Sequence, residues 1–403
     1  MCPVALRSPG EDLNDAMNIV SESVSVSSQP IAKHCTLDPD HKHDPHATRF
    51  GKFLQACIKF EGSDLIVKTG TVPKIRLRGD LKPLDTEPVE FEEFMSIAKH
   101  ILTEEQFADL HQYGSVDFAY DYDAKNRFRI NLFQSRGKLS CAARLVTSKI
   151  KRFEDLHLPP VMAEVAMQPQ GIVILAGVTG SGKSTTIASM LNYINANKRV
   201  HIVTLEDPIE YIFEDQKATI HQREIGIDCL DFKTGLRALV RENPDVVLIG
   251  EMRDSETFEA ALHAAETGHL VFGTIHASSA PQTFGRIYDL FKPEERDQVR
   301  KILAYQMRAI VYQKLLPTLK PEIHRIPAVE ILINNAVVRK YIMEGRENEL
   351  LDVIKSQEGL QSGMIDFNGS LVNLVEKEYI HMRVAMEATP NADELRMRLK
   401  GIG

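Results

Sequence analysis

A glycine-rich segment in the middle of the chain constrains its fold more than any other feature. Residues 177–184 match the pattern G-x-x-x-x-G-K-[ST] at every fixed position. Glycines let such a loop curl until successive backbone N–H groups point at phosphate oxygens. The lysine of the pattern reaches the β- and γ-phosphates, and the hydroxyl of its last residue is a ligand for Mg²⁺. The segment therefore predicts a phosphate-binding loop within an α/β domain.

The residues on either side of this loop have the patterns of a strand and a helix. Residues 171–176 are a short apolar run, as in a strand buried in a parallel sheet. Residues 185–196 are predicted to be a helix, whose N-terminal dipole would favour anion binding. This order favours a true phosphate loop over a chance run of glycines. The predicted nucleotide-binding residues are Gly177, Val178, Thr179, Gly180, Ser181, Gly182, Lys183, Ser184 and Thr185.

The composition excludes several classes of protein. With 403 residues, the chain is long enough for two or three domains. Its net charge of −8 gives no general reason to expect nucleic-acid binding. Its 5 cysteines form no CxxC pair, which argues against a disulfide framework and a four-cysteine zinc site. The scattered cysteines therefore make us expect a protein of the reducing cytosol. No apolar run is long enough to span a membrane.

The first 150 residues divide into a leader and a small domain. Residues 1–46 are predicted to be a disordered leader, because they contain a serine-rich stretch and no apolar periodicity. The histidines in this leader could bind a metal, but a solvated polar tail is the simpler interpretation. Residues 47–148 are predicted to be an α+β domain, with helices at 50–60 and 91–101 and a strand at 65–68.

A hairpin is also predicted in this first domain. Apolar residues alternate with polar ones on both sides of a turn at 123–126, at Phe118, Tyr120, Tyr122, Phe128, Ile130 and Leu132. Arg127, Arg129 and Asn131 then lie on the opposite face of the second strand.

The second half of the chain alternates strands with helices. Residues 149–160 carry charges and a Pro-Pro pair and are predicted to be a linker. The predicted strands of the domain at 161–336 are 171–176, 201–205, 246–250 and 270–274, and the helices are 185–196, 232–241 and 255–267. This alternation favours a parallel, doubly wound sheet. Residues 337–403 are predicted to be mostly helical.

Carboxylates and histidines lie beside three of these strands. Glu251 ends an apolar strand, where folds of this kind handle Mg²⁺ or the attacking water, so we predict it as a catalytic residue and, with Ser184, as a metal ligand. Glu206 and Glu210 follow another strand at the same carboxyl edge and are predicted to act there. The alternative is that these carboxylates cap loops and helices. His269 and His276 flank a third strand, where one of them could sense the γ-phosphate or be structural.

Four motifs in this order resemble those of secretion ATPases. After the phosphate loop, residues 206–210 resemble the Asp box of that family, 250–254 its atypical Walker B motif, and 267–276 its His box. The chain thus resembles the type II/IV secretion ATPase superfamily, specifically its PilT-type twitching-motility ATPases. Segments of the first domain, at 62–65, 73–76 and 127–131, resemble the PAS-like N-terminal domain of the same family.

This resemblance implies a RecA-like P-loop NTPase domain, preceded by the PAS-like domain and followed by a helical region. It implies ATP and Mg²⁺ as cofactors, and a homohexamer in which ATP lies between the two domains and a neighbouring subunit completes the site. Glu251 would be the catalytic glutamate, Glu210 a second essential carboxylate, and His269 and His276 the His-box histidines. Arginines would neutralise charge on the γ-phosphoryl group. The candidates, each of which could equally be a surface arginine, are Arg129, Arg144, Arg237 and Arg241.

The resemblance also implies a cellular function. The expected protein is a cytoplasmic motor, peripheral at the inner face of the membrane, which acts on an inner-membrane platform protein to retract type IV pili. Residues 337–345 resemble the retraction-type motif A-I-R-N-L-I-R-E-G but differ at Lys340, Tyr341 and Met343, among others. The alternatives are a PilU-like accessory role, another secretion-system ATPase, a nucleotide-dependent regulator and a nucleic-acid translocase.

Overall fold

The computed structural model describes residues 48–401 except Arg78, Ala124 and Val240. The predicted leader at 1–46 and its histidines lie outside these residues. Contacts divide the chain into two compact units, Met1–Ser148 and Lys149–Gly403. Each unit has its own core and is described by itself.

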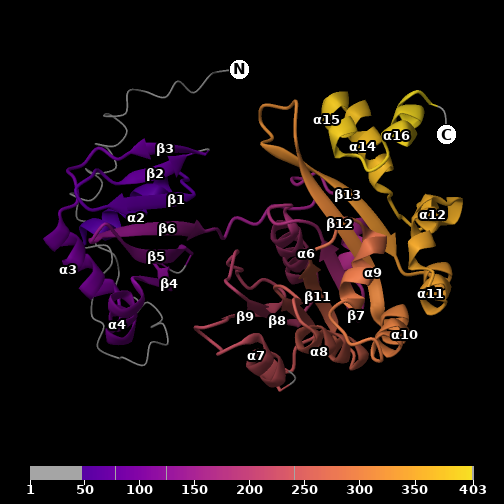
Figure 1. The fold of residues 1–403 in the computed structure, drawn as a ribbon, viewed down its shortest axis with the longest axis horizontal. Coiled ribbons are helices and arrows are strands. Elements are labelled where there is room, and N and C mark those ends of the chain that lie inside the picture. The colour runs from indigo at the N-terminus through magenta and orange to yellow at the C-terminus, as the bar shows by residue number, and fades with distance from the viewer. Residues whose placement is uncertain (1–47, 78, 124, 240, 402–403) are drawn as a thin grey trace. The chain divides into compact units, whose positions relative to one another are not determined.

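The first unit is an antiparallel sheet packed against helices (Figure 1). Its strands, in the spatial order β3-β2-β1-β6-β5-β4, are β1 (Asp64–Lys68), β2 (Lys74–Leu77), β3 (Asp80–Pro83), β4 (Ser115–Asp121), β5 (Arg127–Ser135) and β6 (Lys138–Val146). Helices α2 (Arg49–Lys59), α3 (Phe91–Ile101) and α4 (Glu104–Tyr113) share one apolar core with the sheet. The predicted α+β architecture is confirmed, whereas the likeness to a PAS domain stays a prediction.

The predicted hairpin is present as β4 and β5. Phe118 pairs with Ile130 across the two strands, and Phe128, Ile130 and Leu132 are fully buried. Arg129 on the opposite face is exposed, as the alternation predicts. Strands β2, β3 and β6 were not predicted. Every residue of β3 is exposed, so the strand lacks the apolar alternation that reveals a buried one.

The second unit is built on a seven-stranded sheet in the order β13-β12-β7-β11-β10-β8-β9. The strands are β7 (Gly171–Ala176), β8 (His201–Glu206), β9 (Thr219–Glu224), β10 (Val246–Ile249), β11 (Leu270–Ile275), β12 (Met307–Pro317) and β13 (Arg325–Ile333). All pairs are parallel except the hairpin of β12 with β13. The predicted parallel sheet is thus confirmed, with an antiparallel edge strand that was not predicted.

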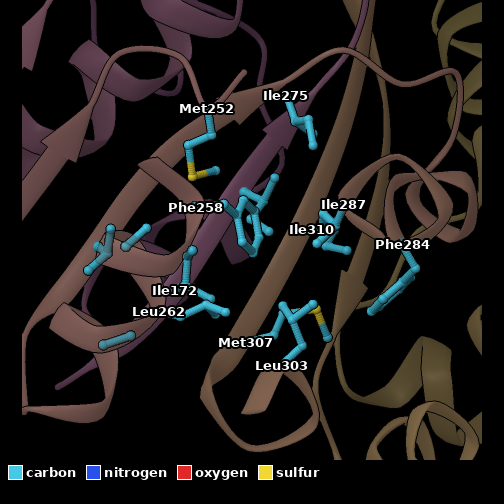
Figure 2. Close-up of a cluster of buried hydrophobic side chains, with 14 of the residues drawn as sticks. Ile172, Met252, Phe258, Leu262, Ile275, Phe284, Ile287, Leu303, Met307 and Ile310 are labelled. Carbon is cyan, nitrogen blue, oxygen red and sulfur yellow. The ribbon is translucent and has the colours of Figure 1, made fainter. Parts of the chain in front are cut away.

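Both faces of this sheet are covered, so alternate residues of one strand face different cores. Ile172 and Ile174 of β7 pack with one group of helices, α7 (Phe232–Leu239), α8 (Ser255–Glu266), α9 (Ala280–Tyr288) and α10 (Arg296–Gln306). Figure 2 shows Phe258 and Leu262 of α8 in this core. Val173 and Leu175 pack with α5 (Val161–Ala166) and α6 (Lys183–Asn197) on the other face. This two-sided cover is the predicted doubly wound arrangement.

The segment predicted as a linker, 149–160, packs partly on the second unit. Phe153 and Leu158 are buried in the same core as α6, and the ring of Phe153 lies 5.3 Å from that of Tyr193. These apolar residues were overlooked because charges and prolines dominate the segment.

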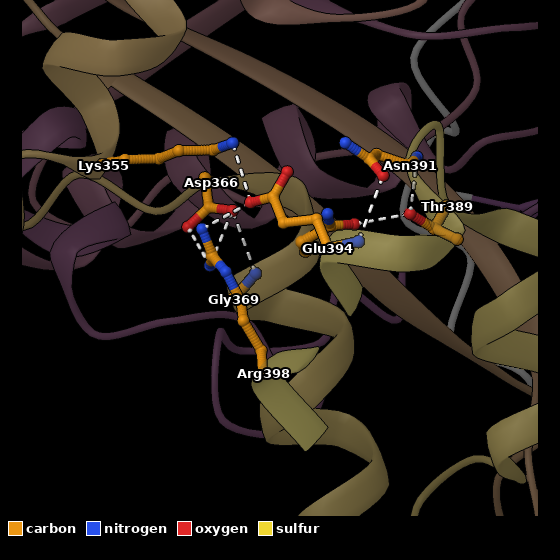
Figure 3. Close-up of polar contacts among 8 residues, drawn as sticks. Lys355, Asp366, Gly369, Thr389, Asn391, Glu394 and Arg398 are labelled. Atoms are coloured by element: carbon orange, nitrogen blue, oxygen red, sulfur yellow. Dashed lines mark hydrogen bonds and ion pairs between the residues drawn. The ribbon is translucent and has the colours of Figure 1, made fainter. Parts of the chain in front are cut away.

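The C-terminal region is helical, as predicted. Its helices are α11 (Ala336–Met343), η2 (Glu347–Glu349), α12 (Leu350–Lys355), α13 (Gln357–Gln361), α14 (Phe367–Glu376), α15 (Met382–Ala388) and α16 (Ala392–Leu399). Figure 3 shows how charges hold the last helix, with Arg398 donating to both oxygens of buried Asp366 at 3.0 Å and Glu394 paired with Lys355. None of the helices within the described ranges is long and apolar enough to cross a membrane.

Candidate nucleotide-binding site

A cavity of about 350 Å³ lies at the carboxyl edge of the second unit's sheet. It is lined by the phosphate loop and α6, by the segment that follows β8, and by the ends of β10 and β11. Parallel strands in register deliver these pieces together, since Leu205 of β8 pairs with Ile249 of β10, which pairs with Gly273 of β11. Ligands of open α/β sheets bind at this edge.

The phosphate loop curls around its own lysine. Nζ of Lys183 donates to the carbonyl oxygens of Gly177 at 2.8 Å and Val178 at 3.1 Å. No carboxylate of the described residues lies within ion-pair distance of this ammonium group. Burial lowers the pKa of Lys183, while the charges of Glu251 and Glu210 act in the opposite direction. A buried cation held only by carbonyls fits an anionic ligand such as phosphate.

The loop residues divide into two groups. Four of the nine predicted nucleotide-binding residues line the cavity: Thr179, Gly180, Lys183 and Ser184. The other five belong to the loop outside the cavity lining or to the start of α6: Gly177, Val178, Ser181, Gly182 and Thr185. The hydroxyl of Thr185 lies 2.7 Å from that of Tyr211. Tyr211 lines the cavity as well, and sequence reasoning did not identify it.

Glu251 lies in the cavity between two basic side chains. Its Oε2 accepts a hydrogen bond from Arg253 at 2.6 Å, and its Oε1 lies 3.0 Å from Nε2 of His276. The hydrogen bond from Arg253 is the main cause that lowers the pKa of Glu251, so the carboxylate is ionised at neutral pH. The structure thus brings together Glu251, His276 and Arg253. The sequence did not predict a role for Arg253, which lies within the motif at 250–254.

Glu206 and Glu210 have different environments within the same cavity. Glu206 is buried and accepts hydrogen bonds from Thr204 at 2.7 Å and Gln222 at 3.1 Å. Burial raises the pKa of Glu206 to about 7, against the effect of these hydrogen bonds. Glu210 is exposed and lines the cavity.

Several predicted site residues do not line this cavity. His269 lies at the start of β11, and its Nδ1 is 2.9 Å from the carbonyl oxygen of Ala264, whereas His276 follows the other end of the strand. Arg237 on α7 and Arg241 after it are exposed and lie outside the lining. In the first unit, Arg129 of β5 lies opposite Arg144 of β6 in the antiparallel register. Arg144 donates a hydrogen bond to Asp64 at 2.9 Å. Roles for these residues stay predictions.

The oxygen ligands at the cavity suit a hard cation. The hydroxyl of Ser184 and the carboxylate of Glu251 both line it, and Mg²⁺ prefers oxygen ligands. Within the described part of the chain, no group of three His, Cys, Asp or Glu side chains could hold a metal by itself. Protein ligands here therefore fit a Mg²⁺ ion that is also bound by nucleotide phosphates and water.

A phosphate loop between strand and helix, facing an ionised carboxylate at the end of a neighbouring strand, defines a P-loop nucleotide-binding domain. Residues 127–370 match the family model described as "Type II/IV secretion system protein". The chain therefore belongs to this family.

Two curated relatives match most of the chain. The type IV pilus retraction ATPase PilT of Pseudomonas aeruginosa is 38% identical over 336 residues, which cover 83% of this chain and 96% of PilT. The Escherichia coli protein YggR is 42% identical over 315 residues, which cover 78% of this chain and 94% of YggR. A crystal structure of the pilus retraction motor PilT with bound ADP aligns with a TM-score of 0.80 and 38% identity, over 87% of this chain and 99% of that one.

Proposed function

We propose that this protein is a Mg²⁺-dependent ATPase motor that drives type IV pilus retraction. One observation carries the proposal: the phosphate loop and the ionised Glu251 line one cavity, in a chain similar to PilT over 96% of PilT's length. The similar crystal structure is that of the retraction motor PilT with bound ADP.

The residues of the cavity divide the work of hydrolysis. Backbone N–H groups of the loop and the ammonium group of Lys183 bind the phosphates. Glu251 orients the attacking water, and His276 and Arg253 hold this carboxylate in place. Ser184 and Glu251 would hold Mg²⁺, which supplies neutralisation of charge on the β- and γ-phosphate oxygens. We also propose that the carboxylates of Glu206 and Glu210 take part in hydrolysis. His269 is proposed as the second histidine of the His box.

The proposed working form is a homohexamer, in which a neighbouring subunit adds an arginine to the γ-phosphoryl group. The candidates are Arg129, Arg144, Arg237 and Arg241, all on exposed positions or on the sheet of the first unit. The motor would act at the inner face of the membrane, from the cytoplasmic side, on a pilus platform protein.

A genetic experiment tests this function. A strain that lacks the protein should keep its surface pili but fail to retract them, and the wild-type gene should restore retraction. The gene with Glu251→Gln should not restore it, although the protein accumulates normally. Loss of pili in the deletion strain would contradict the proposal and favour an assembly role. Retraction that persists, although weaker under load, would favour an accessory role.

A further inference from the structure

Gln313, which lies outside every motif of the sequence, is buried beneath the phosphate loop. It belongs to β12, whose neighbouring residue Tyr312 pairs with Ala176 at the end of β7. This register puts Gln313 next to the point at which the chain leaves β7 and enters the loop. Its side chain is only 2% exposed.

Both ends of the Gln313 amide are bonded to the nucleotide-binding segment. Its Nε2 donates to the carbonyl oxygen of Ser181 at 2.8 Å, and its Oε1 accepts from the hydroxyl of Thr186 at 2.8 Å. One side chain thereby joins the last turn of the loop to the first turn of α6. A buried amide with all of these partners resists displacement, because each broken bond leaves a buried polar group unsatisfied.

Two glycines of the loop pack directly against Gln313. A Cβ at Gly177 would lie 2.5 Å from the carbonyl oxygen of Gln313, and one at Gly182 would lie 2.7 Å from its Nε2. Both glycines also have positive φ, +147° and +88°. The loop therefore wraps directly onto Gln313, with no room for another side chain between them.

The bond to Ser181 fixes the direction of an amide. In a trans peptide, the carbonyl oxygen and the next N–H point in opposite directions. Because the Ser181 oxygen points toward the Gln313 amide, the N–H of Gly182 points away from that amide, and we expect it to be available to a phosphate held by the loop. Among the described residues this N–H has no protein acceptor.

We propose that Gln313 is a positioning residue for phosphate binding, which pre-orients the Gly182 amide and anchors α6 to the loop. The inference rests on the proposed nucleotide-binding function and deepens it. A pre-oriented donor reduces the cost of ordering the loop when the ligand binds. The residue acts on the phosphates that ATP and ADP share, so it contributes to binding of both, and it does not touch the group that orients water.

The test compares Gln313→Met with the wild-type full-length protein. Methionine has a similar volume but cannot make either hydrogen bond. We expect the Kd for ADP and the KM for ATP to rise about tenfold, which is the effect of losing one charge-assisted hydrogen bond from the Gly182 N–H to phosphate. The kcat at saturating ATP should change by less than about twofold. Isothermal titration with ADP and steady-state hydrolysis give these numbers.

A matched control separates positioning from stability. Asn368→Leu removes another buried amide that accepts a threonine hydroxyl, from Thr389 at 2.6 Å, in α14 outside the cavity. This variant should lower the thermal midpoint without changing the Kd for ADP. If Gln313→Met binds ADP as the wild type does, the residue is merely structural and the inference is overturned.

A second variant covers the case in which Gln313→Met does not fold. Gln313→Glu keeps the size and the acceptor for Thr186 but loses the donor to Ser181 and adds a negative charge near the phosphates. ADP affinity should fall at least tenfold, and an unchanged Kd would also overturn the inference. If the wild type itself binds no ADP, the proposed function fails. If the wild type binds and both variants bind equally well, only the role of Gln313 fails.

Discussion

Arg253 donates to Glu251 at 2.6 Å although the two residues are separated by only one position along the chain. The contact holds one oxygen of the carboxylate, while His276 faces the other at 3.0 Å. An amide at position 251 could still accept the bond from Arg253 through its oxygen. Glu251→Gln therefore removes the negative charge with little change in the shape of the side chain.

Glu251→Gln should bind nucleotide but hydrolyse it poorly. The carboxylate that orients water is lost, so we expect kcat to fall about a hundredfold or more, with the Kd for ADP within about threefold of the wild type. Steady-state hydrolysis and isothermal titration measure the two quantities. Glu259→Gln, an exposed change on α8 away from the cavity, serves as the control and should behave as the wild type. Normal turnover in Glu251→Gln would refute the catalytic role.

The buried Glu206 should make stability depend on pH. Its pKa of about 7 in the folded state lies above the value of about 4.3 for an unfolded chain. The folded state therefore holds an extra proton between these values, and stability falls as pH rises through this window and levels off above about 7.

Glu206→Gln keeps an oxygen acceptor for Thr204 and Gln222 and cannot ionise. Relative to the wild type, its free energy of unfolding should rise between pH 5 and pH 7 by an amount on the order of 2 kcal/mol. Urea unfolding at a series of pH values measures this, with Glu259→Gln as the exposed control. A difference between Glu206→Gln and the wild type that does not change with pH would show that Glu206 is ionised throughout.

The exposed face of α11 should be needed for retraction but not for hydrolysis. Lys340 and Met343 are exposed on this helix, whereas Ile342 is fully buried in the core beneath it. Lys340→Glu combined with Met343→Ser should impair retraction in cells and leave ATPase activity within about twofold, because surface changes rarely affect the core. Ile342→Ala should instead lower stability by about 2–4 kcal/mol and reduce both activities. Normal retraction in the double variant would exclude this face as a contact.

The active protein should be a ring of six subunits. Mass measurement with a non-hydrolysable ATP analogue should give six times the mass of the 45.3 kDa chain. Specific activity should also fall on dilution as the ring dissociates. A monomer that is fully active at all concentrations would rule out a site completed by a neighbour.

The leader should be dispensable for catalysis. A chain that begins at Ala47 should fold and hydrolyse ATP as the full chain does, because the sequence before it lacks the apolar periodicity of a core. Thermal unfolding and steady-state kinetics of the two chains give the comparison. Failure of the shorter chain to fold would show that the leader packs on the rest of the protein.

The parts of the site that follow from the sequence are those encoded by neighbouring residues. The phosphate loop, its strand and helix, and Glu251 at the end of an apolar strand each depend on fewer than about 20 consecutive residues. Topology then brings them to one edge, which is why the parallel sheet could be predicted along with them.

The features that were missed depend on residues far apart. The hairpin of β12 and β13 has buried residues on both faces and charged residues within it, so it shows neither alternation nor a clean apolar run. Gln313 and Ser181 are 132 positions apart, and only the pairing of β12 with β7 brings them together. His269 and His276 are close in sequence, yet the six residues of β11 between them separate them by roughly 20 Å.

Strand β12 has a consequence for how the second unit folds. Ile310 near its start packs in the core beneath α8, and Leu316 near its end packs with Phe367 and Leu371 of α14. Ala309 and Val311, on either side of Ile310, pack in the core on the α6 face of the sheet. A single strand therefore contributes to three hydrophobic cores, and none of them is complete without it. A chain cut after β13 would leave the far end of this strand bare of its apolar cover. The C-terminal helices and the nucleotide-binding sheet are thus one cooperative unit in unfolding, which predicts a single transition for both in calorimetry.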